Sequence, residues 1–308
     1  MKEALILINL GAPEKATSEA ASAFLLEFLS DPEVISLNFI FRRAIARIAA
    51  FRRGKAYAER LGRIFDGGAH PLRKHTESLA GKVAARLEGV GVHFAYRYGS
   101  PSIGEVIGRA RAQGAKKFCF IALFPQNASS TTQSAKSEVL RNMRPGEIFD
   151  FVQSYCDHPA YVSALADSIR AAGATECGAL VASFHSVPLK HLAKTPYEAE
   201  CLKTVELLEK ASGMGPIKIA WQSKFGRGGW LGPGTAEVCD SLLASGVKTL
   251  AVICPGFSAD CGETLTEIGS DLRDRFIAGG GERFVLVPCL NDSDSHAEMV
   301  CQIFKGRR

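Results

Sequence analysis

Two short polar segments, each following an apolar run, carry the residue types best suited to chemistry. One is the segment 183–188, in which His185 follows the apolar run 179–182. The other holds Glu263 and follows the apolar run 250–254. Because ligand sites in open parallel sheets form at the carboxyl ends of strands, we expect His185 and Glu263 to face each other across one cleft. An imidazole opposite a carboxylate can hold a divalent metal ion or move protons.

Three carboxylates follow one another at intervals of four residues: Glu263, Glu267 and Asp271. This spacing predicts that they share one face of a helix that begins near Asp260, which can also serve as the helix N-cap. Like charges in such a row repel by about a few tenths of a kcal/mol per pair, so we expect something to compensate them. A hard divalent cation is one compensator, and a solvated acidic stripe is the alternative interpretation.

Strand-like apolar runs that alternate with helical patterns must position these residues. The strand-like runs are 4–8, 92–98, 117–124, 148–154, 178–184, 217–222, 249–254 and 284–288. Alternation of strands and helices predicts an α/β fold with parallel sheets. We expect two similar doubly wound, Rossmann-like domains with four-stranded parallel sheets flanked by helices, and an active-site cleft between them.

The two halves of the chain are also similar to each other. The run 118–126 resembles the run 250–257, since each is an apolar strand that ends in proline before a polar helix start. An internal repeat is one interpretation, and the common form of strand-to-helix turns is the other. The predicted domains are 1–155 and 156–308, with the last helix packing on the first domain.

Composition limits the class of protein and its compartment. The 308 residues are 46% hydrophobic, enough for two buried cores. Lys and Arg exceed Asp and Glu by 37 to 32, too small an excess to indicate a nucleic-acid partner. The sequence shows neither an apolar run long enough to span a membrane nor a signal peptide, so we expect a cytoplasmic location. Nine cysteines without a Cys-x-x-Cys pair suit a reducing compartment.

Several ordered motifs resemble the ferrochelatase family, which inserts ferrous iron into a porphyrin in haem synthesis. The resemblance runs from 7–13 to 288–291, and its motifs are 28–32, 67–72, 96–101, 123–126, 183–188, 221–224, 230–233, 255–257 and 260–265. It implies that His185 is the catalytic proton acceptor and a metal contact, and that Glu263 is the essential glutamate. Glu267 and Asp271 would then carry metal or protons to or from the site.

The resemblance also implies a pocket that binds the porphyrin. The residues matched to porphyrin binding are Arg97, Tyr98, Ser130, Tyr197, Trp230, Asp260 and Cys261. Aromatic side chains would pack on the ring, and a guanidinium such as that of Arg97 can pair with a propionate. Ordinary packing or a surface ion pair is the alternative for each. Fe²⁺ would be a substrate rather than a resident cofactor. A [2Fe-2S] cluster is not expected, because closely spaced cysteine ligands are missing near the carboxyl end.

Three positions depart from the family pattern. Asn127 stands where many members have an aromatic residue, His70 adds a titratable group, and Cys261 stands where many eukaryotic relatives have histidine. The first two leave the shape of the pocket and the preferred tetrapyrrole open. The substrate is therefore predicted as protoporphyrin IX, with coproporphyrin III or another tetrapyrrole and metal as the alternative.

The segment 34–53 combines large apolar side chains with five arginines. It matches the family's lip over the porphyrin pocket, and such a segment can lie on the inner face of the cytoplasmic membrane. A helix packed on its own domain is the alternative. Contact with the preceding porphyrinogen-oxidising enzyme and a monomeric or homodimeric state stay open.

Two competing functions use the same features. A porphyrin or haem carrier without turnover would keep the aromatic walls, but it would have no need of His185 and Glu263. A Rossmann dehydrogenase is disfavoured because no Gly-x-Gly-x-x-Gly motif follows the first predicted strand.

Overall fold

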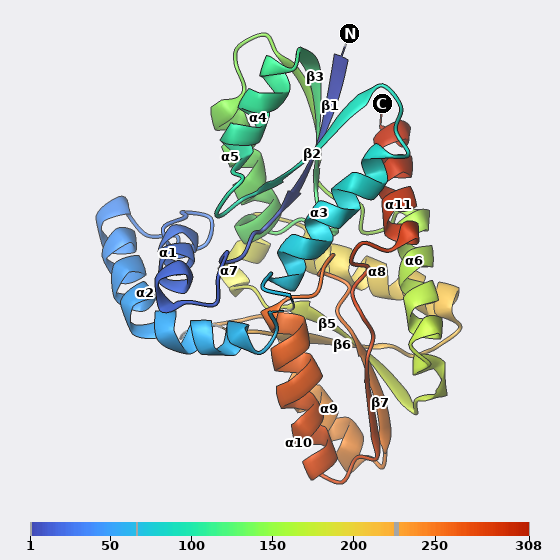
Figure 1. The fold of residues 1–308 in the computed structure, drawn as a ribbon. Helices are drawn as coiled ribbons and strands as arrows, with labels where there is room; N and C mark the ends of the chain where they lie inside the picture. The colour runs from blue at the N-terminus through green and yellow to red at the C-terminus, as the bar shows by residue number, and fades with distance from the viewer. Residues whose placement is uncertain (1, 66, 225–227, 308) are drawn as a thin grey trace. The chain divides into compact units, whose positions relative to one another are not determined.

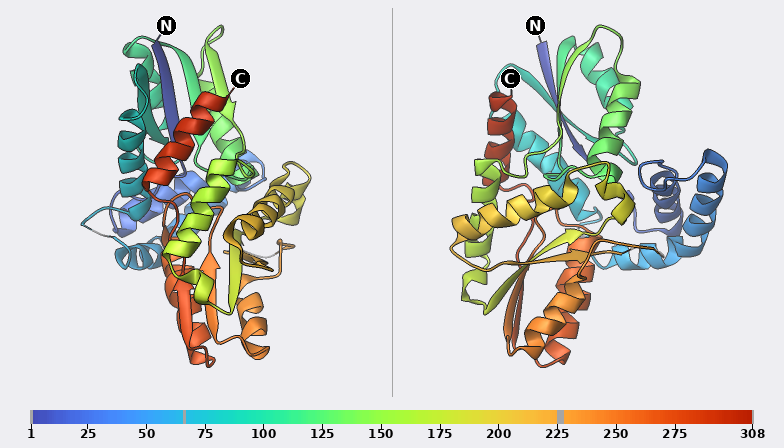
Figure 2. Two further views of the ribbon diagram at one scale, coloured as in Figure 1. Left: turned by 90° about the vertical axis from the view of Figure 1, so that its right-hand side faces the viewer. Right: turned by 180° about the vertical axis from the view of Figure 1, so that it is seen from behind.

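The computed structural model describes residues 2–65, 67–224 and 228–307. The chain forms two compact units, Met1–Ser154 together with Val300–Arg308, and Tyr155–Met299. Each unit contains one four-stranded sheet whose paired strands are all parallel, with helices on its faces (Figures 1 and 2). The predicted α/β class with two four-stranded parallel sheets is therefore confirmed.

The sheet of the first unit has the strand order β2-β1-β3-β4. Its strands are β1 (Lys2–Asn9), β2 (Val90–Tyr96), β3 (Ala115–Ala122) and β4 (Ile148–Val152). Its helices are α1 (Ser18–Leu29), α2 (Phe39–Gly62), α3 (Pro71–Ala84), α4 (Ile103–Ala112), η1 (Ser129–Gln133) and α5 (Ser134–Asn142). The predicted strand 92–98 ends at Tyr96, so Arg97 and Tyr98 lie just beyond the carboxyl end of β2.

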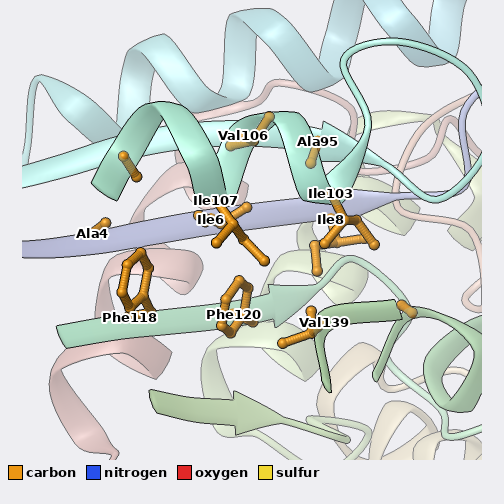
Figure 3. Packing of buried hydrophobic residues seen from close by; sticks show 12 residues of the cluster. Ala4, Ile6, Ile8, Ala95, Ile103, Val106, Ile107, Phe118, Phe120 and Val139 are labelled. Carbon is orange, nitrogen blue, oxygen red and sulfur yellow. The ribbon is translucent and has the colours of Figure 1, made fainter. Parts of the chain in front are cut away.

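Apolar packing on one face of this sheet explains why the strands are apolar along their length. Ile6 and Ile8 of β1 and Phe118 of β3 are buried against α4 and α5, whose contributions include Ile107 and Val139 (Figure 3). A parallel sheet is covered on both faces, so its central strands read as continuous apolar runs rather than alternating ones. This packing fixes β1 and β3, and with them the polar residues at their carboxyl ends.

The sheet of the second unit has the order β6-β5-β7-β8. Its strands are β5 (Ala179–His185), β6 (Lys218–Gln222), β7 (Thr249–Ile253) and β8 (Arg283–Leu286). Its helices are α6 (Pro159–Ala171), η2 (Ala174–Glu176), α7 (Leu189–Leu192), α8 (Tyr197–Ser212), α9 (Thr235–Ala244), η3 (Glu263–Leu272), α10 (Arg273–Ala278) and the start of α11 (Asp294–Gly306). The buried cluster on one face joins Val181 and Val252 of the strands to Cys239, Ile268 and Phe276 of these helices.

The end of α11 belongs to the first unit, because Val300–Arg308 groups with that unit. There the Arg307 guanidinium donates to the Glu3 carboxylate and lies 3.5 Å from the Asp150 carboxylate. Arg307, just after α11, thus forms ion pairs with residues of β1 and β4.

The two units share one topology. In each, the third strand in the sheet order is followed by a π-helix, η1 after β3 and η3 after β7. The segments 118–126 and 250–257, which resemble each other in sequence, occupy these same topological places. Among the described residues, no helix is long and apolar enough to cross a bilayer.

Candidate active site

His185 is the last residue of β5 and lies beside Gln222, the last residue of β6. Its Nδ1 lies 2.7 Å from the Ser186 carbonyl oxygen. A carbonyl oxygen can only accept, so Nδ1 carries the proton and Nε2 of the neutral ring keeps a lone pair. The Tyr197 hydroxyl donates to the His185 carbonyl oxygen at 2.9 Å, which fixes the backbone at this position. His185 therefore presents Nε2 as a base or metal ligand.

Glu263 is the first residue of η3, the helix that follows β7. β7 pairs directly with β5, so His185 and Glu263 come from the carboxyl ends of neighbouring strands. The Gln222 side-chain nitrogen donates to the Glu263 carbonyl oxygen at 2.9 Å. Glu263 lies beyond the carboxyl end of β7, on the side of the sheet where the rule for parallel strands places ligand sites.

The carboxylate row lies on a π-helix rather than on an α-helix, because η3 is π-helical over ten residues. In an α-helix a step of four residues overshoots a full turn by about 40°. The i→i+5 bonds of a π-helix widen the turn, which brings Glu263, Glu267 and Asp271 closer to one straight row. Glu263 and Glu267 are partly buried and Asp271 is exposed, so the row ends at solvent.

Glu267 is held by the residue that follows β6. The Ser223 backbone nitrogen donates to Oε1 at 2.8 Å, and its hydroxyl donates to Oε2 at 2.5 Å. Ser223 adopts a φ of 61°, a left-handed conformation that is uncommon for a residue other than glycine. Over the described parts of the chain, three or more His, Cys, Asp or Glu residues nowhere form a group that could hold a metal ion.

The prediction that Asp260 caps this helix is wrong. Gly262 occupies the N-cap position, and no side chain caps the helix there. The buried Asp260 carboxylate instead accepts from the Thr264 hydroxyl at 2.9 Å and from the Asn291 amide at 2.7 Å. Because both of its oxygens have partners inside the unit, Asp260 fixes the loop that leads into η3.

Cys261 is buried directly before that helix. Burial raises the pKa of the Cys261 thiol well above its usual value, and the nearby charge of Glu263 raises it further. The thiol is therefore neutral and can donate to Glu263, but it is not a thiolate ligand.

The two aromatic residues predicted in this unit lie in different settings. Trp230 is half-buried and pairs with Pro188 in an antiparallel bridge, which holds it just beyond the end of β5. Tyr197 is only 5% exposed, and its ring packs 6.0 Å from that of Trp221. Tyr197 thus supports the backbone of His185, while Trp230 is more exposed than Tyr197.

In the first unit, Arg97 is bound to a carboxylate that the sequence reasoning did not single out. Its guanidinium forms an ion pair with Asp31 and donates through Nε to the Ser134 hydroxyl at 2.6 Å. The Asp31 carboxylate also accepts from the Tyr98 hydroxyl at 2.9 Å and from the Ser134 hydroxyl at 2.5 Å. The side chains of Arg97 and Asp31 are only 10% and 2% exposed, so this is a buried pair.

The same group borders a hollow of about 430 Å³ in the surface of the first unit. Its lining includes the side chains of Arg43 and Arg141 as well as Arg97. The lining also contains the carboxylates of Glu27 and Asp31, so three guanidinium groups against two carboxylates leave a net charge of +1, which suits an anion.

The remaining predicted positions of the first unit have local partners. Ser130 lies half-buried in η1, and the buried Asn127 accepts from the Gln133 amide at 2.8 Å. His70 caps α3, since its Nδ1 accepts from the Leu72 backbone nitrogen at 3.2 Å. The two departures from the family pattern, Asn127 and His70, therefore hold local structure.

Sequence reasoning missed Asp31, Gln222 and Ser223 as parts of the site. Each lies within a motif that carried the resemblance, at 28–32 and 221–224. The signal was present, but the contacts join residues 41 to 103 positions apart, so no local pattern reveals them.

The fold of two parallel four-stranded sheets is shared with solved structures of chelatases. SirB from Bacillus subtilis, solved with Fe³⁺, matches 98% of this chain and 95% of its own with a TM-score of 0.61 and 12% identity. CbiX, described as the terminal enzyme of sirohaem biosynthesis in denitrifying bacteria, matches all of both chains with a TM-score of 0.55 and 13% identity. At these identities the likeness shows the fold alone.

Sequence comparison identifies the family. The ferrochelatase family model matches residues 2–307. A ferrochelatase of Herminiimonas arsenicoxydans is 38% identical over 98% of this chain and 86% of its own length. A ferrochelatase of Aromatoleum aromaticum is 37% identical over 98% of this chain and 87% of its own. The chain belongs to the ferrochelatase family and is an enzyme of haem biosynthesis that inserts a metal into a porphyrin.

Proposed function

We propose that the enzyme inserts Fe²⁺ into protoporphyrin IX, giving protohaem and two protons, and that His185 takes the pyrrole protons through Nε2. The observation that carries this assignment is the bond between His185 Nδ1 and the Ser186 carbonyl oxygen, which leaves the lone pair on Nε2. A neutral imidazole can take up a proton at its free nitrogen, as a general base requires.

The carboxylate row supplies the path between the site and solvent. Glu263 assists delivery of the metal or departure of the protons, and Glu267 and Asp271 continue the row outward. Oxygen ligands in series suit a hard divalent ion that must be released again. Because Ser223 already donates to both oxygens of Glu267, a passing cation displaces or shares those hydrogen bonds.

The porphyrin is oriented by aromatic and cationic groups. Trp230 offers a ring face, and Arg97, Tyr98 and Ser130 offer polar contacts to a propionate or the inner wall. Among the described contacts, Arg97 uses Nε and Nη2 within its own unit, which leaves Nη1 for a substrate. This favours one hydrogen bond to a propionate in place of a bidentate pair.

Coproporphyrin III is the alternative substrate, and the hollow with three arginines is the observation that favours it. Coproporphyrin carries four propionates where protoporphyrin carries two. Arg43, Arg97 and Arg141 line one hollow of the first unit beside Glu27 and Asp31, and the lining keeps a net positive charge that a further propionate can use.

We further propose that α2 binds the surface of an anionic membrane. One face of this helix, including Ala46, Ala50 and Leu61, is buried, and α2 packs beside α1 (Figure 1). The other side exposes Ile40 at 76% and Phe51 at 88% of their surface. Apolar side chains among arginines suit the boundary between lipid headgroups and acyl chains.

The protein is also proposed to work without a [2Fe-2S] cluster. The nine cysteines are all buried, and none of them forms a disulfide. Burial raises the pKa of Cys201, Cys254 and Cys289 well above the usual value, which disfavours the thiolates that a cluster needs.

Anaerobic insertion of Fe²⁺ by the purified protein tests the proposed function. Protoporphyrin IX and coproporphyrin III are supplied in parallel, and the absorbance of the metallated product is followed. Faster turnover of protoporphyrin supports the proposal, and faster turnover of coproporphyrin favours the alternative. A protein that binds either porphyrin tightly and inserts no metal would be a carrier, and the proposal would fail.

A further inference from the structure

One buried amide, that of Gln222, joins the three elements that carry the chemistry of the second unit. Its side-chain oxygen accepts from the Ser183 hydroxyl on β5 at 2.7 Å and from the Cys254 thiol after β7 at 3.5 Å. Its side-chain nitrogen donates to the Glu263 carbonyl oxygen at 2.9 Å. The backbone carbonyl oxygen of Gln222 also accepts from the Ser186 backbone nitrogen at 2.8 Å. Gln222 is only 3% exposed, so these bonds lie away from solvent.

The direction of each bond follows from the chemistry of the partners. The Glu263 carbonyl can only accept, so the amide nitrogen must face it and the amide oxygen must face Ser183. Ser183 therefore donates to Gln222, and the Thr235 hydroxyl, 2.7 Å from Ser183, donates to Ser183. The result is a chain of bonds in one direction, from Thr235 of α9 to the first residue of η3, and such chains strengthen their members.

Glu263 needs such a tether because its connection to the sheet is long. The segment 254–262 separates the end of β7 from η3, so the strand alone does not fix the position of the first carboxylate. Gln222 lies beside His185 in the sheet, and its amide reaches the backbone of Glu263. It therefore sets the spacing between the base and the first carboxylate.

We propose that Gln222 is a positioning residue, which holds Glu263 against His185 for metal insertion through the bond to the Glu263 carbonyl oxygen. This inference rests on the proposed function. Gln222 acts through Glu263 and does not itself touch the substrate. A misplacement of about 1 Å in a reacting group can reduce the rate by about a hundredfold.

Two variants separate this role from packing. Gln222→Leu keeps the size of the side chain and removes the bond to Glu263. Ser183→Ala is the matched control, because it removes a bond to the other end of the same amide and keeps the bond to Glu263. We expect Gln222→Leu to lower kcat for Zn²⁺ insertion by about ten- to a hundredfold, with the Kd of the porphyrin changed by less than about threefold. Ser183→Ala should lower kcat by less than about threefold.

Equal loss of kcat in both variants, or kcat within about threefold of wild type in Gln222→Leu, would overturn the inference alone. A wild type that inserts no metal would overturn the proposed function and this inference with it.

A second measurement needs no turnover and holds even if Gln222→Leu folds poorly. Gln222→Glu replaces the amide by a carboxyl group of the same shape. This carboxyl can donate a hydrogen bond only when it is protonated, and burial favours the protonated form. Hydrogen exchange of the η3 amides, compared with wild type at the same pH, should be faster in the variant at about pH 8. The difference should narrow at about pH 5.5, where the carboxyl regains an O–H donor. A difference that does not change with pH would contradict the tether.

Discussion

The two sheets of the molecule have the same strand order but end in opposite chemistry. In the first unit, β2 leads into Arg97, and the π-helix after β3 begins with the hydroxyl residues 129–132. In the second unit, β5 ends in His185, and the π-helix after β7 carries a row of carboxylates. One scaffold thus presents a guanidinium and hydroxyl groups in one copy, and an imidazole and carboxylates in the other. The difference lies in the side chains at and beyond the strand ends, not in the fold.

The first strands of the two units show the same contrast at a single position. β1 ends in Asn9, whose amide donates to the Thr76 hydroxyl at 2.9 Å and accepts from the Leu10 backbone nitrogen at 2.8 Å. β5 ends in His185, whose Nε2 keeps its lone pair. An amide at the end of β1 holds local structure, while an imidazole at the end of β5 can exchange protons.

Loss of the first carboxylate of the second unit should have the largest effect on this contrast. Glu263→Gln keeps the size and the backbone bond to Gln222 but removes the charge. From the role proposed for Glu263 in proton or metal transfer, we expect kcat to fall by about 10²- to 10⁴-fold while porphyrin binding is retained. Stopped-flow metallation and quenching of porphyrin fluorescence give the two values. Equal losses of porphyrin binding and of kcat would instead show that Glu263 acts in binding the porphyrin, which would contradict its proposed role in transfer.

The buried ion pair of the first unit should matter next, and mainly for stability. Asp31→Leu leaves the Arg97 charge buried without its partner, which costs about 3–5 kcal/mol of unfolding free energy. The double variant Asp31→Leu with Arg97→Leu should recover most of that loss, because neither charge is then left alone. Denaturant unfolding measures both. Equal destabilisation in the single and double variants would mean that packing, not charge, explains the effect.

A pH effect of the second unit is expected to be smaller. Burial lowers the pKa of His296 to about 4, against about 6.5 for an unperturbed histidine. Between these values the unfolded chain binds the extra proton, so the unfolding free energy should fall by roughly 3 kcal/mol as pH drops from about 6.5 to about 4. His296→Gln is the control, and its unfolding free energy should lack this part of the slope. Identical pH profiles for both proteins would show that His296 does not titrate in this way.

The smallest expected effect concerns α2 of the first unit, the helix proposed to bind a membrane surface. Phe51→Asp places a charge on an exposed apolar position of α2 and should weaken binding to anionic vesicles by about tenfold. Leu140→Ser, on the exposed face of α5, is the matched control and should leave vesicle binding unchanged. Co-sedimentation with vesicles gives the comparison, and equal binding by both variants would remove the membrane role of α2.

The positions of His185 and Glu263 after their strands could be predicted from the sequence. The hydrogen bonds that support these residues could not. His185 and Glu263 follow apolar runs, and the general rule for parallel sheets places both at one edge. The bond from Gln222 to Glu263 depends on β5 lying between β6 and β7, an order that the chain does not reveal locally.

The winding of η3 and its N-terminus were also beyond the sequence pattern. A spacing of four residues fits an α-helix and a π-helix alike, so the pattern could not tell them apart. The cap at Asp260 was mispredicted because Thr264 and Asn291 take its carboxylate oxygens. Side chains that compete for one acceptor are decided by the packed structure, not by position in the sequence.

His185→Ala tests the central claim most directly, because it separates binding of the porphyrin from insertion of the metal. Porphyrin binding and Fe²⁺ insertion are measured on the same anaerobic sample of wild type and variant. The structure predicts a porphyrin Kd within about threefold of wild type and an insertion rate lower by about 10²- to 10⁴-fold, since a base is lost but the pocket is kept. Insertion within about threefold of the wild-type rate would contradict the assignment of His185 as the proton acceptor.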